Sequence, residues 1–213
     1  MHPIYPVFWY STEFRGRVVD AKTGQPIPDA VVLATWQLVG SFVENYRIKK
    51  IAVEEVLTDV QGTFRIPSWG PRFYFLPGRI LNEQPHITIL KKDYLPLTLD
   101  NHPKAMGDNG YGMNAEAIIR FDWQDEDLKM APRGEDIAAY ELAMNDIWSL
   151  RVGDLFTDKR CDWQYAPLSL VFLHNVKKEL ASYQRGNNLR YIFEIGIFPH
   201  CGNLRPEAFL KGH

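Results

Sequence analysis

The sequence contains only 2 cysteines among its 213 residues. That is too few for a disulfide-stapled scaffold or for a four-ligand zinc site. An excess of charge of one sign is also missing, because 24 lysines and arginines and 26 aspartates and glutamates give a net charge of −2. This balance argues against a strongly basic nucleic-acid-binding protein and against a polyacidic tail. We therefore expect no nucleic-acid partner.

Long apolar runs are missing as well. The longest candidate, residues 30–43, is interrupted by polar residues and by Gly40, whereas a membrane-spanning helix needs about 20 consecutive apolar residues. We therefore expect no transmembrane segment. Residues 1–12, MHPIYPVFWYST, lack the charged and apolar regions of an intact signal peptide. Two interpretations remain: the start of an exported protein whose leader has been removed, or an aromatic arm that packs on the body of the protein.

Hydrophobic residues, by contrast, make up 46% of the chain, aromatic residues 13% and charged residues 23%. These fractions are typical of a folded globular protein. In the first half, short segments rich in β-branched and aromatic residues alternate with turn signals. The pattern predicts β-strands at residues 14–20, 30–38, 51–58, 63–66, 86–90, 95–99 and 117–121. Short strands in this order favour a Greek-key sandwich over βαβ units.

Three motifs in this half carry a resemblance. Residues 16–32, GRVVDAKTGQPIPDAVV, resemble the opening of a carboxypeptidase regulatory-like domain, and residues 58–64, TDVQGTF, resemble the T-D-x-x-G-x-F hairpin of that family. Residues 92–96, KDYLP, resemble its third motif, usually K-x-G-Y, with Asp93 where glycine is common. The resemblance covers residues 14–121. It implies a mainly β fold, a seven-stranded transthyretin-like (prealbumin-like) Greek-key sandwich, which is followed here by a helical C-terminal layer.

The resemblance also implies what the motif residues do. In metallocarboxypeptidases the domain lies beside the catalytic unit and holds no catalytic residue, and in other bacterial proteins it is a spacer or a binding module. We accordingly expect structural roles for these residues. Gly16 should allow close packing in a strand, and Gly24 and Gly62 should serve turns. Asp59 is expected to cap a turn and Phe64 to fill the core.

The chain divides into an aromatic N-terminal arm at residues 1–13, a regulatory-like β-sandwich at residues 14–122 and a mostly helical region at residues 123–213, which we expect to pack on the sandwich. Residues 123–132 are interpreted as an acidic connection. Apolar residues at steps of three and four predict one helix from Glu135 and a second that opens near Pro167.

Two segments of the sandwich, residues 39–50 and 67–85, are longer than tight hairpins need. They carry aromatic and arginine side chains that could form a platform for stacking a sugar or a peptide. The candidate platform residues are Phe42, Tyr46, Trp69, Arg72, Phe73 and Tyr74. In the alternative, these aromatic side chains lie back on the sandwich or contact a second domain.

Recognisable catalytic motifs are absent from the sequence. None of the 6 histidines stands in H-E-x-x-H spacing, and no G-x-S-x-G nucleophile elbow occurs. His200 and Cys201 are adjacent, but neighbours on an irregular segment seldom face each other, and a cysteine nucleophile needs a base that the fold places beside it. We expect no catalytic residue, no metal site and no cofactor.

The 2 cysteines, Cys161 and Cys201, lie outside the predicted sandwich in polar, irregular segments. In an exported protein oxidation is the default, and closing a loop of about forty residues would stabilise the fold by roughly 4 kcal/mol. We therefore expect a disulfide between them if the protein is exported. In a reducing compartment both would remain free thiols.

These observations favour a non-catalytic cell-envelope protein that uses a transthyretin-like domain for binding or assembly. The resemblance extends to exported or lipid-anchored proteins of Gram-negative bacteria. It implies a periplasmic or envelope-associated location, allows a lipid anchor on the precursor, and suggests another envelope protein or a glycan as the partner. Two alternatives stay open: a carbohydrate- or peptide-binding accessory module that uses the loop aromatics, and a hydrolase with its site between the sandwich and the helices.

Overall fold

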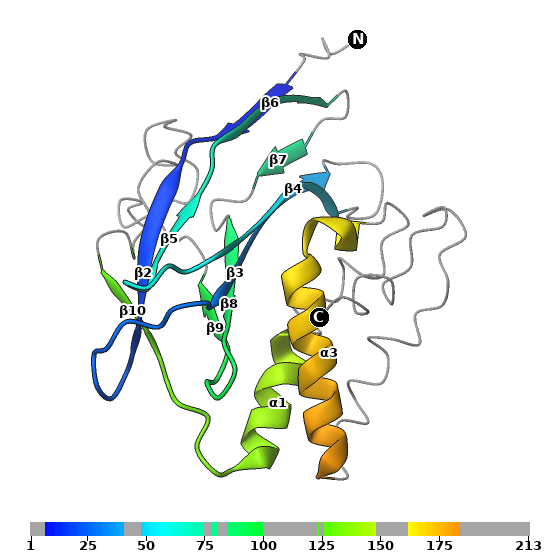
Figure 1. Cartoon of the computed structure of the whole chain (residues 1–213). Coiled ribbons are helices and arrows are strands. Elements are labelled where there is room, and N and C mark those ends of the chain that lie inside the picture. Colours follow the sequence, from blue (N-terminus) through cyan, green and yellow to red (C-terminus); the bar gives the residue numbers. More distant parts are fainter. Residues whose placement is uncertain are drawn as a thin grey trace, which may run out of the picture.

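The computed structural model describes residues 7–40, 48–74, 78–80, 85–99, 123, 126–147 and 162–183. Within these residues the protein is mainly β, with its strands arranged in several sheets and with helices in the C-terminal part (Figure 1). The elements in chain order are β1 (Val7–Ser11), β2 (Phe14–Asp20), β3 (Val31–Gly40), β4 (Ile48–Leu57), β5 (Thr63–Ile66), β6 (Trp69–Tyr74), β7 (Gly78–Ile80), β8 (His86–Leu90), β9 (Leu97–Leu99), β10 (Asp127–Met130), α1 (Ile137–Ile147), the 3-10 helix η3 (Asp162–Tyr165) and α3 (Pro167–Ser182).

An outer sheet joins β10, β2 and β5 in that spatial order. Strands β2 and β5 are antiparallel, with Phe14 opposite Ile66 and Arg17 opposite Thr63, whereas β10 runs parallel to β2. Side chains alternate between the two faces of each strand. One face of the outer sheet is therefore apolar and buried, and the other carries charged residues.

A central sheet orders β4, β3, β8 and β9 by antiparallel pairing, and β7 pairs with the end of β3. The outer and central sheets pack face to face over one apolar cluster. The outer sheet contributes Phe14, Val18, Phe64, Ile66, Leu128 and Met130 to this cluster, and the central sheet contributes Val32, Ala34, Trp36, Ile51, Ala52, Ile87 and Ile89. We call it the sandwich core.

The opposite face of the central sheet is covered by α1 and α3, which lie side by side along it (Figure 1). Val31, Leu33 and Leu90 of the sheet share a second apolar cluster with Tyr140, Met144, Ile147, Leu170, Leu173, Val176 and Leu180 of the helices. Neighbouring residues of β3 point to opposite faces, so Val32 enters the sandwich core while Leu33 contacts the helices. This burial on both faces explains the continuous run of apolar and β-branched residues in β3.

The described helices begin close to where the sequence predicts them. One carboxylate oxygen of Asp136 accepts hydrogen bonds from the backbone N–H groups of Ala138 and Ala139 at 2.9 and 3.0 Å, which caps α1. Pro167 occupies the first turn of α3, where its missing N–H costs no hydrogen bond. Neither of these helices combines the length and the apolar character needed to cross a bilayer.

Most predicted strands agree with the structure. Those at residues 14–20, 63–66 and 86–90 coincide with β2, β5 and β8. Those at 30–38, 51–58 and 95–99 correspond to β3, β4 and β9 with shifted ends. The strand predicted at 117–121 lies outside the described residues.

Three segments differ from their prediction. The sequence predicts one long loop at residues 67–85, but this segment contains β6 and β7. The N-terminal arm, in turn, contains the strand β1. Residues 123–132 were predicted as an acidic connection, but they contain β10. This strand is short and pairs with β2, so that Asp127 meets Arg17 across a sequence separation of 110 residues. A local pattern cannot show a partner that lies so far away in the sequence.

Candidate interaction surface

Strands β1 and β6 form a two-stranded antiparallel ribbon that continues beyond the ends of β2 and β5 (Figure 1). Val7 pairs with Tyr74 at one end of this ribbon, and Ser11 pairs with Trp69 at the other. The register shifts between Trp9 and Ser11, and such an irregularity bends a strand and changes the direction of its side chains. We call β1 and β6 together the aromatic ribbon.

The aromatic ribbon exposes large aromatic side chains beside the charged Arg72. Phe8 is 58% exposed, Tyr10 68% and Phe73 38%. Phe8 lies opposite Phe73 in the pairing, and their ring centroids are 5.2 Å apart at an interplanar angle of 49°. Trp9 lies half-buried against the sandwich core. Because exposed aromatic side chains that gather in one place are typical of interaction surfaces, this ribbon is the candidate site.

The residues predicted to form a platform divide between the core and the surface. Trp69 is only 6% exposed, and its ring packs edge-on against Trp36 at a centroid distance of 5.3 Å. The guanidinium carbon of Arg72 lies 5.2 Å from the centroid of the Trp69 ring, and Arg72 also donates a hydrogen bond to the backbone carbonyl of Ile51. Phe73 is exposed. Trp69 is therefore part of the core, because its ring closes one end of the sandwich instead of facing solvent.

The remaining platform candidates are only partly placed. Tyr74 pairs through its backbone with Val7, while Phe42 and Tyr46 lie outside the described residues. The structure adds Phe8 and Tyr10, which the sequence assigned only to an aromatic arm. The signal that could have placed them is the strand-like composition of VFWYS at residues 7–11.

Thr58, the first residue of the second motif, joins two segments through its buried hydroxyl. The hydroxyl donates a hydrogen bond to the carbonyl of Ile27 at 2.7 Å and accepts one from the N–H of Ala30 at 2.8 Å. The backbone of Thr58 also bonds with Asp29 and Ala30, both at 3.0 Å. These bonds hold the end of β4 against the connection that leads into β3, so this residue has a structural function.

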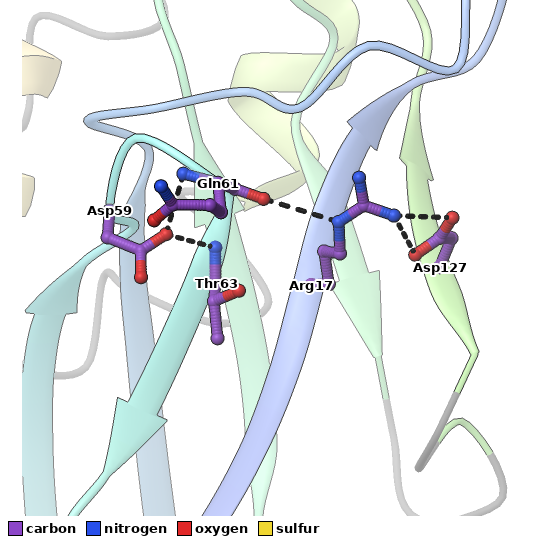
Figure 2. Close-up of polar contacts among 5 residues, drawn as sticks. All are labelled: Arg17, Asp59, Gln61, Thr63 and Asp127. Atoms are coloured by element: carbon purple, nitrogen blue, oxygen red, sulfur yellow. Dashed lines mark hydrogen bonds and ion pairs between the residues drawn. The ribbon is translucent and has the colours of Figure 1, made fainter.

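Asp59 caps the turn that follows, as the sequence predicts. One of its carboxylate oxygens accepts hydrogen bonds from the N–H groups of Gln61 and Thr63 at 2.9 and 2.8 Å (Figure 2). The carbonyl of Gln61 accepts a hydrogen bond from Nε of Arg17 at 3.2 Å, and Nη1 of Arg17 lies 3.1 and 3.2 Å from the two carboxylate oxygens of Asp127. The turn is therefore tied to the outer sheet through Arg17.

Gly16 and Phe64 make the close packing that the sequence predicts. A Cβ atom at Gly16 would lie 2.5 Å from Cζ of Phe64 and 3.4 Å from a methyl carbon of Leu128. Phe64 is fully buried in the sandwich core. The absent side chain of Gly16 thus provides the space that the Phe64 ring occupies.

Asp20 organises the turn in the first motif. Its Oδ1 accepts hydrogen bonds from the N–H groups of Lys22 and Thr23 at 2.8 and 2.7 Å, and its Oδ2 accepts one from the hydroxyl of Tyr94 at 2.9 Å. The backbone hydrogen bond from Thr23 is the main reason that the pKa of Asp20 lies below its ordinary value. Asp20 therefore connects the first motif with the third.

Glu55 of β4 links the central sheet to α3. Its two carboxylate oxygens accept hydrogen bonds from the backbone N–H groups of Leu168 and Ser169, each at 2.7 Å. These groups belong to the first turn of α3, which has no partner for them within the helix. Burial raises the pKa of the Glu55 carboxyl, and the hydrogen bonds from α3 act in the opposite direction without cancelling this effect.

Replacing Glu55 with alanine should lower the free energy of unfolding by about 1–3 kcal/mol, because two partly buried N–H groups lose their acceptor. Glu55→Gln is the matched control, because the amide keeps one acceptor oxygen.

The carboxyl has a raised pKa in the folded state, so the unfolded chain loses its proton first as the pH rises above 4.5. The wild type should therefore lose stability relative to Glu55→Gln as the pH rises from about 4 to about 7. Urea unfolding at both pH values measures this difference, and a slope of the opposite sign would contradict the assignment.

Among the described residues, no cluster of three or more His, Cys, Asp or Glu side chains is placed to hold a metal ion. His174 lies half-buried on α3, and burial lowers the pKa of its imidazole. Cys161, His200 and Cys201 lie outside the described residues, so the disulfide stays a prediction.

Comparisons with known proteins give little further information. No family model matches the sequence, and no curated protein matches it either. Among solved structures, the chain is similar to the 3-chlorocatechol 1,2-dioxygenase of Rhodococcus opacus 1CP, with a TM-score of 0.26 and 22% sequence identity. The alignment covers 44% of this chain and 44% of the dioxygenase, so it spans less than half the length of either. A likeness at this TM-score carries no argument about fold or chemistry.

Proposed function

We propose that this chain is a non-catalytic binding or assembly protein of the cell envelope. In this proposal it is built on a seven-stranded, transthyretin-like Greek-key sandwich of the carboxypeptidase regulatory-like family. The observation that carries the binding function is the group of exposed aromatic side chains on the aromatic ribbon, Phe8, Tyr10 and Phe73. The envelope location rests on the resemblance of the three sequence motifs alone.

The conformation of the third motif supports the family assignment. Asp93 has a φ of +67°, in the left-handed region that glycine adopts most readily. The related motif usually has glycine at this position. Asp93 therefore adopts the backbone conformation that suits the glycine of the related motif, and it is followed by a tyrosine, Tyr94, as in that motif.

The hydrogen bonds of the motif residues support a structural use of the domain. Thr58, Asp59 and Asp20 all bind backbone groups within the sandwich. Most described side chains that meet between the central sheet and the helices are apolar, such as Leu33 and Leu173, and the carboxylate of Glu55 binds backbone N–H groups of α3. A hydrolase would need convergent polar groups at that interface, and for this reason we favour the non-catalytic proposal.

The geometry of the ribbon favours a protein partner over a sugar. The rings of Phe8 and Phe73 are inclined by 49° to each other, so they do not form one flat stacking surface. Aromatic side chains that differ in direction suit the irregular, apolar centre of a protein interface. A carbohydrate- or peptide-binding module is the second candidate, since single exposed rings also stack on sugars.

The experiment compares native complexes of the wild type and of the double variant Phe8→Ser/Tyr10→Ser by size-exclusion chromatography after gentle extraction. We expect the wild type to elute in a larger complex. The variant should weaken this complex by at least about tenfold, because interface aromatics contribute ~1–2 kcal/mol or more each. The matched control Tyr165→Ser/Tyr183→Ser changes two exposed aromatics on η3 and after α3, and it should keep the complex.

The outcomes separate the candidates. If the Phe8→Ser/Tyr10→Ser variant keeps both its melting temperature and the complex, the ribbon is not the binding surface. If a glycan array binds the wild type and the variant loses that signal, the carbohydrate-binding alternative replaces the proposal.

A further inference from the structure

The outward face of the β10–β2–β5 sheet carries a row of basic side chains. Phe14, Gly16 and Val18 of β2 face the sandwich core or lie against it, so the intervening Arg15 and Arg17 point outward. By the same alternation, Arg65 of β5 and Lys129 of β10 lie on this face, and all four are exposed. We call Arg15, Arg17, Arg65 and Lys129 the basic face.

Two of these arginines are placed directly against each other. Arg15 is the pairing partner of Arg65 in the antiparallel ladder, and like charges in that position destabilise a sheet. A single carboxylate, that of Glu13, bridges them: its Oε1 lies 3.0 Å from Arg15, and its Oε2 binds Arg65. The side chains of Arg15 and Arg65 are nevertheless 64% and 62% exposed. Much of both side chains therefore remains accessible to a ligand.

The anions that already contact this face show which chemistry it accepts. Glu13 lies between β1 and β2, and Asp127, which pairs with Arg17, belongs to the strand β10. Both groups are carboxylates, and that of Asp127 is presented by an extended strand. Guanidinium groups match carboxylates in geometry and bind them with charge-assisted hydrogen bonds.

We propose that the basic face binds an extended acidic segment of a partner protein, with alternate Asp or Glu side chains directed at the arginines. Among the described residues of this face, the basic side chains Arg15, Arg17, Arg65 and Lys129 exceed the acidic Glu13 and Asp127, so an anionic ligand improves the charge balance. Arg15 and Arg17 are two residues apart on one strand, at about 6.6 Å. Alternate carboxylates of an extended peptide have this same spacing.

This surface is distinct from the aromatic ribbon, and the proposal does not depend on the function assigned to the ribbon. The basic residues belong to β2, β5 and β10, whereas the exposed aromatics belong to β1 and β6. A variant of one surface can therefore be tested while the other stays unchanged.

The test measures binding of a fluorescently labelled oligo-glutamate peptide to the full chain by anisotropy at low salt. The variant Arg15→Gln/Arg65→Gln should weaken binding by about tenfold or more, because it removes two charge-assisted contacts. Lys92→Gln/Lys178→Gln is the matched control, because it removes the same charge from two exposed lysines outside this face. The control should bind within about twofold of the wild type, since the interactions of distant charges are screened.

A third variant is expected to change the affinity for the peptide in the opposite direction. Glu13→Gln removes the carboxylate that competes for Arg15 and Arg65, so peptide binding should become a few-fold tighter. Equal loss of binding in the basic-face variant and in the lysine control would overturn the proposal, as would weaker binding by Glu13→Gln at an unchanged melting temperature. Tighter binding to vesicles of an anionic phospholipid than to the peptide would also overturn it and would assign the face to a membrane surface.

Discussion

Replacing Gly62 with alanine is expected to lower the free energy of unfolding by about 2–5 kcal/mol, through left-handed backbone strain and steric overlap. Gly62 has a φ of +74°. A Cβ atom there would collide with the backbone carbonyl of Val18 and would lie 3.1 Å from the nitrogen of Ile27. Because both neighbours are backbone atoms of the first motif, they cannot move aside without disturbing the sandwich. Urea denaturation of the wild type and the variant measures the loss.

Gly24→Ala is the matched control for this prediction. Gly24 has nearly the same φ, +71°, but no atom lies within 4 Å of the Cβ position. This variant should lose only the conformational cost of a left-handed alanine, about 1 kcal/mol. Equal losses at both glycines would show that the close approach of the second motif to the first is not present in solution.

Replacing Trp69 with alanine should lower the free energy of unfolding by about 3–5 kcal/mol, as expected for a large buried aromatic residue. The substitution removes the edge-on contact with Trp36 and the surface on which the guanidinium of Arg72 stacks. It would open a cavity at the end of the sandwich core where the aromatic ribbon begins. Thermal and urea unfolding report the change.

Tyr10→Ala is the control for Trp69, because Tyr10 lies on the same ribbon but is exposed. A surface substitution of this kind usually changes stability by less than about 0.5 kcal/mol. A Trp69→Ala variant that is as stable as Tyr10→Ala would contradict the placement of Trp69 in the core and would restore it as a candidate for a surface platform.

The parts of the fold that could be predicted from the sequence are those determined by short-range signals. The strand at residues 14–20 shows alternation, and the turn at residues 59–62 contains the Asp and Gly that its backbone requires. The helix that opens at Pro167 combines an apolar stripe with a proline in its first turn. In each case the residues that carry the sequence pattern are the same residues that form the local structure.

The parts that could not be predicted depend on partners far away in the sequence. Nothing near residues 127–130 indicates that they pair with β2, and nothing near residues 7–11 indicates that they pair with β6. The exposure of Trp69 and Phe73 was unpredictable for the same reason. Both are aromatic residues of one strand, but only the position of the sandwich core decides that Trp69 is buried and Phe73 is exposed.

The exposed aromatic side chains of the ribbon can be examined directly by hydroxyl-radical footprinting with mass spectrometry. The reaction would be carried out on the purified protein and on the protein in its native complex. The account predicts that Phe8, Tyr10 and Phe73 are modified in the purified protein and protected in the complex, while Tyr165 and Tyr183 are modified in both. Equal modification of Phe8, Tyr10 and Phe73 in the two samples would contradict the assignment of the aromatic ribbon as the binding surface.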